Sequence, residues 1–391
     1  MSHRALMVAA VLLIGSCSSN NDHAVGEERG PCYPNSTCNA GLVCASSLCV
    51  RLTDDGSAGD RAKPRDGSGK DAATDLPLKT DGPRVWSGVS TLAGAAGPGF
   101  ADGPVASAKF LNPAALAIAG SKLYIADRDN HRVRVIDLQS GTVTTRAGSG
   151  TMGFLNGAGA SAQFNAPSGL TIGQKGEVLV ADTANHRIRA IAADGQVTTV
   201  AGTGTPGCSV GSIVSAPLFS PRGLAVDPFG TIGMASFGCS SVVTIASGST
   251  NGLSGGNSLR GVTGLAVDST GGWLVSEQTG HQITHLVGGQ ALVYAGSVSG
   301  NDDGDAAWAK FNGPSGLFLQ HNALYVADTY NHRIRLVENA KVSTVAGTKS
   351  GYLDGPPKSA AFNLPYAVAV DAVGKIYVAD MGNSMIRVIA P

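Results

Sequence analysis

Three nearly identical strings carry a carboxylate, a carboxamide, an imidazole and a guanidinium at fixed spacing. They read ADRDNHRVR from Ala126, ADTANHRIR from Ala181 and ADTYNHRIR from Ala327. Imidazole and carboxylate groups are common zinc ligands, so a metal site is the first chemistry to consider. The groups concerned are Asp127, Asn130, His131, Arg132, Asp182, Asn185, His186, Arg187, Asp328, Asn331, His332 and Arg333.

The strings lie inside a repeated unit of four short strands. In the clearest unit, 311–348, the apolar runs Ser315–Leu319, Ala323–Ala327, Ile334–Val337 and Val342–Ala346 alternate with turn residues and show no helical period. Four consecutive strands, repeated along a chain, predict the blades of a β-propeller. The units open at intervals of 40 to 55 residues, at Phe110, Phe164, Phe219, Leu259, Phe311 and Phe362.

Six copies of the fourth strand predict six blades. The last unit has only three strands before Pro391, whereas a spare fourth strand precedes the first unit. We expect this early strand to complete the last blade, because closing the ring removes exposed sheet edges. The six copies are Val89–Gly94, Val143–Gly148, Val197–Gly202, Val242–Ser247, Ala291–Gly296 and Val342–Gly347.

A ring of six blades keeps the repeated polar groups apart. His131, His186, His281 and His332 would fall on four blades at an equivalent radius, too far apart for one ion with nitrogen ligands at about 2.0–2.1 Å. Repetition favours a structural role instead, with Asp and Asn holding turns. We expect the Arg and His that follow to pair with the Asp of their own or a neighbouring blade, and no metal to bind there.

The repeated string resembles the signature of NHL-repeat β-propellers, over roughly residues 88–391. Blade six keeps Asp380 and Asn383 but has Ser384 at the His position, and blade four has Glu277 at the Asp position. Blade three has lost the string, with Ser236, Cys239, Ser240 and Ser241 in register. The resemblance implies an all-β, six-bladed propeller of the NHL type. Members of the family bind proteins, RNA or small molecules, and a few enzymes share the architecture.

Composition argues against a general electrostatic partner. The 391 residues contain 28 Lys and Arg against 28 Asp and Glu, and aromatic residues make up 5%. A neutral chain with few aromatic side chains has neither the basic surface nor the stacking platform typical of nucleic-acid binding. We therefore expect a protein or another ligand of the cell envelope as partner, and no nucleic acid.

The N-terminal region predicts export and lipid anchoring. Residues 1–16 read as a signal peptide, because Arg4 precedes an apolar run, Ala5–Ile14, that is too short to span a bilayer. The sequence LIGSC, ending at Cys17, resembles a bacterial lipoprotein lipobox; an ordinary secretory signal is the alternative. The resemblance implies acylation of Cys17 and anchoring in the envelope through the lipid alone. By analogy with such lipoproteins, Ser18 rather than Asp after the Cys implies sorting to the outer membrane in a Gram-negative cell.

Three segments are expected between the signal peptide and the propeller at 86–391. Residues 17–31 are a tether, and residues 51–85, rich in Asp, Lys, Gly, Pro and Ser, are a disordered linker. Residues 32–50 form a small module whose size calls for cross-links. Its cysteines favour disulfides over zinc, since the segment lacks a Cys-x-x-Cys pair and is exported; they are Cys32, Cys38, Cys44 and Cys49.

Two more cysteines lie within the propeller. Cys208 is in the connection that enters blade three, and Cys239 is in the turn between the second and third strands of that blade. These two loop types emerge on the same face, so we expect a disulfide; two buried free thiols are the alternative. Closing a loop of this size stabilises a protein by roughly 3 kcal/mol.

Departures from the repeat indicate where a ligand would bind. They gather at blades three and four, with two aromatic side chains on nearby loops, although decay of the repeat without function is an equal alternative. The candidate ligand face consists of Arg222, Phe237, Arg260, Glu277, Gln278, His281, Trp308 and Tyr330. We expect a lipid-anchored binding protein that uses this face.

A channel-centred, metal-dependent lyase or hydrolase is the alternative function. Six-bladed enzymes of similar architecture work at the central channel, whereas the innermost strands here contain no acid and no His, and no nucleophile–base pair is recognisable. An enzyme is therefore the less favoured interpretation. The acidic run Asp302, Asp303 and Asp305 has the hard oxygens that calcium prefers, but not a full EF-hand ligand set.

Overall fold

The structure, a computed structural model, describes residues 43–45, 48–50, 84–253 and 259–391. The chain divides into two units, Met1–Pro77 and Leu78–Pro391. In the first, β1 (Val43–Ala45) and β2 (Leu48–Val50) form an antiparallel hairpin in which Cys44 lies opposite Cys49 in the backbone register. The predictions for Cys17, Cys32 and Cys38, the signal peptide, the tether and most of the linker fall outside the described residues.

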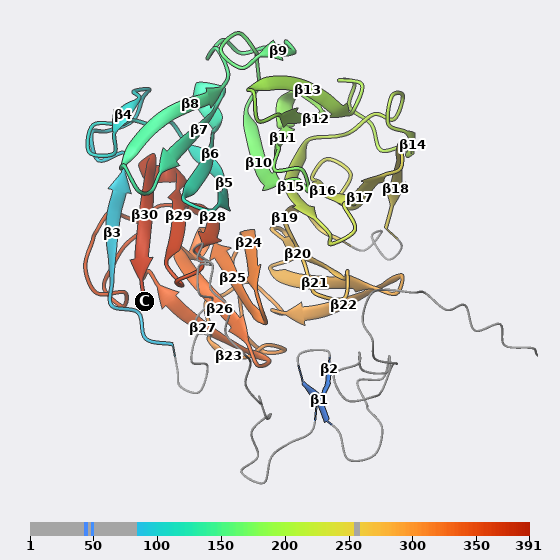
Figure 1. Ribbon diagram of the computed structural model, residues 1–391. Helices are drawn as coiled ribbons and strands as arrows, with labels where there is room; N and C mark the ends of the chain where they lie inside the picture. The colour runs from blue at the N-terminus through green and yellow to red at the C-terminus, as the bar shows by residue number, and fades with distance from the viewer. Residues whose placement is uncertain (1–42, 46–47, 51–83, 254–258) are drawn as a thin grey trace, which may run out of the picture. The chain divides into compact units, whose positions relative to one another are not determined.

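The second unit consists of six antiparallel sheets arranged as blades around one axis (Figure 1). Blade one contains β5 (Pro113–Ala119), β6 (Lys122–Asp127), β7 (Arg132–Asp137) and β8 (Thr142–Ala147). Blade two contains β10 (Pro167–Ile172), β11 (Val178–Asp182), β12 (Arg187–Ile191) and β13 (Gln196–Ala201). Blade three contains β15 (Pro221–Val226), β16 (Ile232–Ser236), β17 (Ser241–Ala246) and β18 (Ser249–Gly252).

Blades four to six continue the ring. Blade four contains β19 (Val262–Val267), β20 (Trp273–Glu277), β21 (Gln282–Val287) and β22 (Gln290–Ala295). Blade five contains β24 (Pro314–Gln320), β25 (Ala323–Asp328), β26 (Arg333–Glu338) and β27 (Lys341–Ala346). Blade six contains β28 (Pro365–Val370), β29 (Ile376–Asp380) and β30 (Met385–Ala390), together with β3 (Gly88–Ala93).

Short elements complete the blades. Two-residue strands precede four of them: β4 (Gly103–Pro104), β9 (Gly157–Ala158), β14 (Gly211–Ser212) and β23 (Gly304–Asp305). Single 3-10 turns join the second and third strands: η1 (Arg128–Asn130), η2 (Thr183–Asn185), η4 (Thr329–Asn331) and η5 (Met381–Asn383). None of the helical turns among the described residues has the length and apolar character needed to cross a bilayer.

The predicted closure of the ring is confirmed. β3 pairs antiparallel with β30, with Val89 opposite Ile389, so the strand that precedes blade one forms the outer edge of blade six. In Figure 1 the light-blue β3 lies beside the red β30. The innermost strands β5, β10, β15, β19, β24 and β28 each contact the next in the ring, and β28 contacts β5.

Two details of the sequence prediction for blade three are wrong. Val242–Ser247 was expected as its fourth strand, but this stretch is the third strand, β17, and a two-residue turn leads to the true fourth strand, β18. Phe219 was expected at the buried opening position of the unit. Leu218 occupies that position and is buried, whereas Phe219 is exposed and its ring contacts that of His186.

Apolar side chains from neighbouring blades form the core, and small residues let the innermost strands approach. One cluster joins Val89 and Ile389 of blade six to Ile334 of blade five, and another joins Phe110 of blade one to Tyr377 of blade six. A Cβ added at Gly169 would lie 1.7 Å from the carbonyl oxygen of Arg222 in the next blade. Backbone contact of this kind admits only glycine.

A side chain of each 3-10 turn or equivalent turn bonds to the backbone of the next blade. In four blades a His Nδ1 accepts a backbone N–H, and in two a Ser Oγ does so. One of the two Ser contacts joins blade six back to blade one. The pairs are His131 with Ala166 (3.2 Å), His186 with Ser220 (3.1 Å), Ser240 with Gly261 (3.3 Å), His281 with Gly313 (3.2 Å), His332 with Leu364 (3.1 Å) and Ser384 with Asn112 (3.3 Å).

We call these six contacts the inter-blade latch. All twelve residues in it have φ between 47° and 62°, the left-handed region that non-glycine residues rarely adopt. The expectation that the His side chains pair with Asp is therefore wrong: they accept the N–H that the tight turn of the next blade leaves free. Burial lowers the pKa of His186 and His332, and Arg187 lowers that of His186 further, which favours the neutral imidazole that an acceptor requires.

The closing strand predicts a position-specific loss of stability. Val89 is 3% exposed against Ile389, whereas its neighbour Ser90 is exposed. Val89→Asp should lower the free energy of unfolding by roughly 2–4 kcal/mol, because it buries a carboxylate and removes apolar packing. Ser90→Asp should change it by less than about 0.5 kcal/mol. Urea unfolding measures both; equal effects would show that β3 does not seal blade six.

The latch predicts a pH dependence. Because the folded pKa of His186 and His332 is lowered from 6.5, the unfolded chain binds more protons as the pH falls through and below that value. The free energy of unfolding should then decrease, by up to about 1.4 kcal/mol per pH unit for each His. The double variant His186→Ser, His332→Ser keeps an acceptor that does not titrate, as at Ser240 and Ser384. Urea unfolding at pH 7 and pH 5 should give a smaller decrease for it; an identical decrease would contradict the latch.

Candidate ligand-binding site at the channel mouth

The Asp at the end of the second strand binds three groups in four of the blades. In blade one, Asp127 accepts the N–H of Leu111 (2.8 Å), the amide of Asn130 (2.8 Å) and Nη1 of Arg134 (2.7 Å). Burial raises the pKa of Asp127, Asp182, Asp328 and Asp380, and these hydrogen bonds with their arginine oppose that shift. Such a carboxylate holds its own blade together.

The arginine that pairs with this Asp is the last residue of the string, two positions after the one that follows the His. Arg134, Arg189, Arg335 and Arg387 are fully buried, and each also reaches a loop Asp or Asn: Asp102, Asn156, Asp303 and Asp354. The prediction that the first arginine pairs with the Asp is wrong. Arg132 and Arg187 donate to carbonyl oxygens instead, as does Arg333. The available signal was the arginine at the last position of all four strings, including ADMGNSMIR of blade six, which has no other arginine.

Blades three and four lack this ion pair. In blade four, the carboxylate of Glu277 is 1% exposed and accepts the N–H of Arg260 (2.7 Å), the amide of Gln282 (2.9 Å) and the hydroxyl of Thr284. In blade three, Ser236 stands at the Asp position and donates to the carbonyl of Phe219 (3.1 Å). Blade three has thus lost both members of the pair, whereas blade four keeps a buried carboxylate and lacks its arginine.

Arg222 is a different kind of arginine. It lies at the second position of β15, half-buried, and its guanidinium is 3.5 Å from the centre of the Phe237 ring. Its Nη1 donates to the hydroxyl of Tyr366 (3.2 Å), on β28. Since β15 and β28 are opposite in the ring of six, this bond crosses the channel where the innermost strands begin. No local pattern indicates Tyr366, which lies 144 residues from Arg222 in the chain.

The charge of Arg222 has no carboxylate partner among residues 84–253 and 259–391. Each buried arginine of the repeat has a carboxylate in ion-pair contact, whereas the described partners of Arg222 are an aromatic ring and a hydroxyl. A planar guanidinium with donors to spare binds carboxylate and phosphate in two-point fashion. The channel mouth on this face is therefore suited to an anion.

Other members of the candidate face lie apart from this pair. Arg260 is exposed, Gln278 is buried and donates to Ser315 (3.2 Å), and His281 belongs to the latch. Tyr330 follows in η4, and its ring covers Gly313. The backbone N–H of Trp308 donates to the backbone carbonyl of Asp305, beside the outer strand of blade five rather than at the channel. The structure brings Arg222 and Phe237 together, brings the backbone N–H of Arg260 to the carboxylate of Glu277, and places Trp308 away from both pairs.

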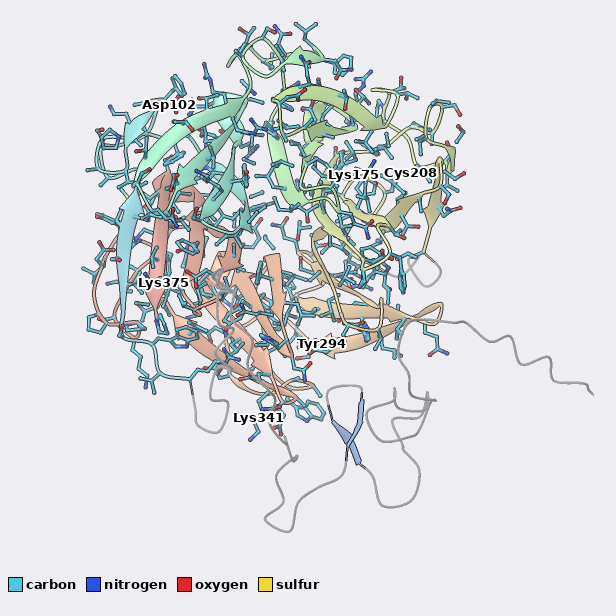
Figure 2. The ribbon with its side chains drawn as sticks, viewed as in Figure 1. Asp102, Lys175, Cys208, Tyr294, Lys341 and Lys375 are labelled. Atoms are coloured by element: carbon cyan, nitrogen blue, oxygen red, sulfur yellow. A yellow bond between two sulfur atoms is a disulfide. The ribbon has the colours of Figure 1, made fainter. Side chains whose placement is uncertain are left out.

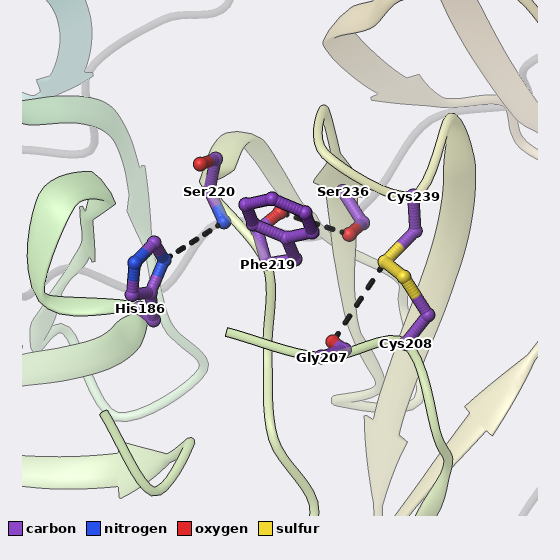
Figure 3. The surroundings of a disulfide bond; sticks show 7 residues. All are labelled: His186, Gly207, Cys208, Phe219, Ser220, Ser236 and Cys239. Carbon is purple, nitrogen blue, oxygen red and sulfur yellow. Dashed lines mark hydrogen bonds between the residues drawn. A yellow bond between two sulfur atoms is a disulfide. The ribbon is translucent and has the colours of Figure 1, made fainter. Parts of the chain in front are cut away.

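The predicted disulfide between Cys208 and Cys239 is confirmed (Figure 3). It ties the connection entering blade three to the turn that also holds Phe237 and the latch residue Ser240. The cross-link closes 31 residues of chain and stabilises the blade by roughly 3 kcal/mol in the chain-entropy account. It compensates for the Asp–Arg pair that this blade lacks.

The acidic run proposed for calcium is engaged in ion pairs. Asp303 binds Arg335 and the N–H of Thr344, and Asp302 binds Lys310 (2.8 Å), which lowers the pKa of Asp302. No group of three His, Cys, Asp or Glu with metal-binding geometry occurs in the described part of the chain. Two clefts of about 630 and 700 Å³ lie between blades one and two and between blades four and five.

Comparison with known proteins agrees with the repeat and the fold. The NHL repeat family pattern matches residues 164–191. The chloroplastic protein SUPPRESSOR OF QUENCHING 1 of Arabidopsis thaliana is 30% identical over 72% of this chain, and human NHL repeat-containing protein 2 is 27% identical over 78%. The chain spans only 30% and 42% of the length of these two relatives.

Solved structures share the architecture. An auxiliary nutrient binding protein from Bacteroides thetaiotaomicron has a TM-score of 0.62 at 17% identity, over 89% of this chain and 87% of that one. A structural genomics protein of unknown function from the same organism has a TM-score of 0.61 at 22% identity, over 78% and 76%. At these identities the likeness concerns the fold. Repeat and fold together identify the chain as an NHL-repeat six-bladed β-propeller.

Proposed function

We propose that this propeller is a binding protein whose ligand carries a carboxylate or phosphate and binds at the channel mouth around Arg222. The observation that carries the proposal is a half-buried guanidinium held by Phe237 and Tyr366 without a carboxylate partner among the described residues. Contact with a ring and a neutral hydroxyl fixes its position but leaves its charge uncompensated. An anionic ligand supplies that compensation.

The surrounding first-strand residues support a small site. The positions equivalent to Arg222 are Ala114, Ser168, Thr263, Ser315 and Tyr366, so Arg222 is the only cation at this level of the innermost strands. A binding role also agrees with the name of one structural neighbour, the auxiliary nutrient binding protein, although the similarity to that protein concerns the fold. We infer that recognition combines one charge with aromatic contact from Phe237 and Tyr366.

Thermal unfolding with a panel of anions tests this proposal. Acetate, glutamate, citrate and inorganic phosphate are added to the full chain, and at least one should raise Tm in a saturable way. Arg222→Gln should weaken that binding roughly tenfold or more, since it removes a charge-assisted hydrogen bond.

Arg146→Gln is the matched control, because Arg146 lies on the outer strand of blade one, away from the channel. It should bind the anion as the wild type does. An anion effect that survives Arg222→Gln, or the absence of any effect, would rule out the site. A stoichiometric divalent ion in the purified protein would instead favour the alternative, a metal-dependent lyase or hydrolase.

We further propose that the protein is held in the bacterial envelope by a lipid on Cys17. The supporting pattern is the apolar run Ala5–Ile14 followed by Gly15, Ser16 and Cys17. Two or more acyl chains anchor a protein stably, whereas a single chain is marginal.

Metabolic labelling with palmitate tests the anchor. The full chain should be labelled and should sediment with membranes, and Cys17→Ser should abolish both. Cys208→Ser with Cys239→Ser should leave the label in place, since those sulfurs are joined to each other. Label retained in Cys17→Ser would refute acylation at this residue.

A further inference from the structure

The outer strand of a blade is a sheet edge, and in five blades another segment of the chain covers it. β4, β9, β14 and β23 pair antiparallel with β8, β13, β18 and β27. In blade six Gly355 exchanges two backbone hydrogen bonds with Val89 of β3 (2.8 and 2.9 Å). Each cover comes from the connection that precedes its blade. The cover satisfies N–H and C=O groups that an edge strand otherwise leaves free.

Two positions of the outer strand carry this contact. The second residue faces the cover strand: Val89, Val143, Val197 and Val342 lie opposite glycines of the covers. The fourth residue is a threonine, and the N–H groups of Thr91, Thr145 and Thr344 donate to the loop carboxylates Asp354, Asp102 and Asp303 at 3.0–3.1 Å. The outward N–H groups of the edge are therefore those of positions two and four.

Blade four differs at both positions and in its connection. No described residue pairs with the outer edge of β22, and its preceding connection, 253–261, is about half the length of 296–313 before blade five. Ala291 stands at position two and Val293 at position four, where three blades have a bonded threonine. Leu292 and Val293 are 49% and 58% exposed. The outer edge of β22 is thus more apolar than the edges that are covered, and it is the edge that no described residue covers.

A cleft of about 700 Å³ runs beside this edge, between blades four and five. Val293, Tyr294, Ala306, Ala307 and Ala340 line it, and Asp305 is the one charged residue of its lining. Figure 2 labels Tyr294 on this part of the ring. Trp308, which follows Ala307, is 79% exposed. Natural sheet edges are protected by charge, proline or a cover, and β22, with the sequence QALVYA, contains no charged residue and no proline.

We propose that the outer edge of β22 binds an extended, uncharged segment of another polypeptide, which adds an antiparallel strand and places aliphatic side chains in the cleft. The other blades show that this edge position accepts an added strand, since each receives one from its own connection. A Cβ built on the cover glycines Gly157, Gly304 and Gly355 meets no atom within 4 Å, so there is open space beside the edge. The φ of these glycines, 123° to 132°, favours glycine, so a bound strand with larger residues has to take ordinary β geometry at that point. Main-chain bonds to Ala291 and Val293 give affinity, and the apolar cleft gives selectivity.

Peptide binding tests the proposal. The probe is a fluorescein-labelled, uncharged hexapeptide of alternating Thr and Val, titrated with the full chain and followed by anisotropy. Saturable binding is expected, and Val293→Lys should weaken it tenfold or more by placing a charge in the cleft. Thr199→Lys, at the same position of the covered strand β13, should bind as the wild type does. A hexapeptide with N-methylated alternate amides should not bind. No saturable binding, or equal binding by Val293→Lys, overturns the proposal.

Hydrogen exchange of the free chain tests the open edge without any substitution. The amides of Ala291 and Val293 should exchange at least tenfold faster than those of Val342 and Thr344, their covered counterparts in β27. Equal protection would mean that the chain covers its own edge and would overturn the proposal. Analytical ultracentrifugation tests whether the chain forms a dimer through this edge. A dimer that Val293→Lys dissociates would assign the edge to a second copy of the chain and would also overturn the proposal. Neither result bears on Arg222.

Discussion

The inter-blade latch is the contact on which the propeller depends. Each blade turns back so tightly that its first strand leaves one backbone N–H without a partner in its own sheet, and the preceding blade provides an imidazole nitrogen or a hydroxyl oxygen to accept it. The requirement is an acceptor at the correct place, which explains why Ser240 and Ser384 replace His without breaking the ring. The same requirement explains why the His side chains are unavailable as metal ligands.

Charged side chains also divide into those that hold a blade together and those that are free to contact a ligand. Arginines that hold a blade are fully buried against carboxylates. Of the blades without this pair, blade four has the carboxylate of Glu277 bonded to neutral donors, and blade three has a disulfide. Arg222 follows neither pattern, because its described contacts are neutral and it lies at the channel mouth. Blade four departs in another way, at its outer edge. The two candidate surfaces, at Arg222 and at the outer edge of β22, thus lie where the residues depart from the contacts that the other blades repeat.

Much of the fold was predictable because the repeat is visible in the chain. The buried openers Phe110 and Phe362, the strand at Val89 and the Cys208–Cys239 pair were placed correctly. Blade three was misread because Leu218 and Phe219 are both apolar and a two-residue turn hides β18. The string predicts Arg132 rather than Arg134 as the partner of Asp127 because Arg132 lies directly opposite Asp127 in the register, yet it is the guanidinium of Arg134, two residues further along β7, that reaches the carboxylate. Tyr366 meets Arg222 only through ring closure, which no local pattern encodes.

Native-state hydrogen exchange of the closing strand tests the central claim most directly. If β3 locks the ring, its amides, such as that of Val89 bonded to Gly355, are as well protected from exchange as those of β8 in blade one, because both are outer strands that are hydrogen-bonded on both sides. Exchange of β3 near the rate of a free peptide, while β8 remains protected, would show that blade six has three strands and that the ring is open.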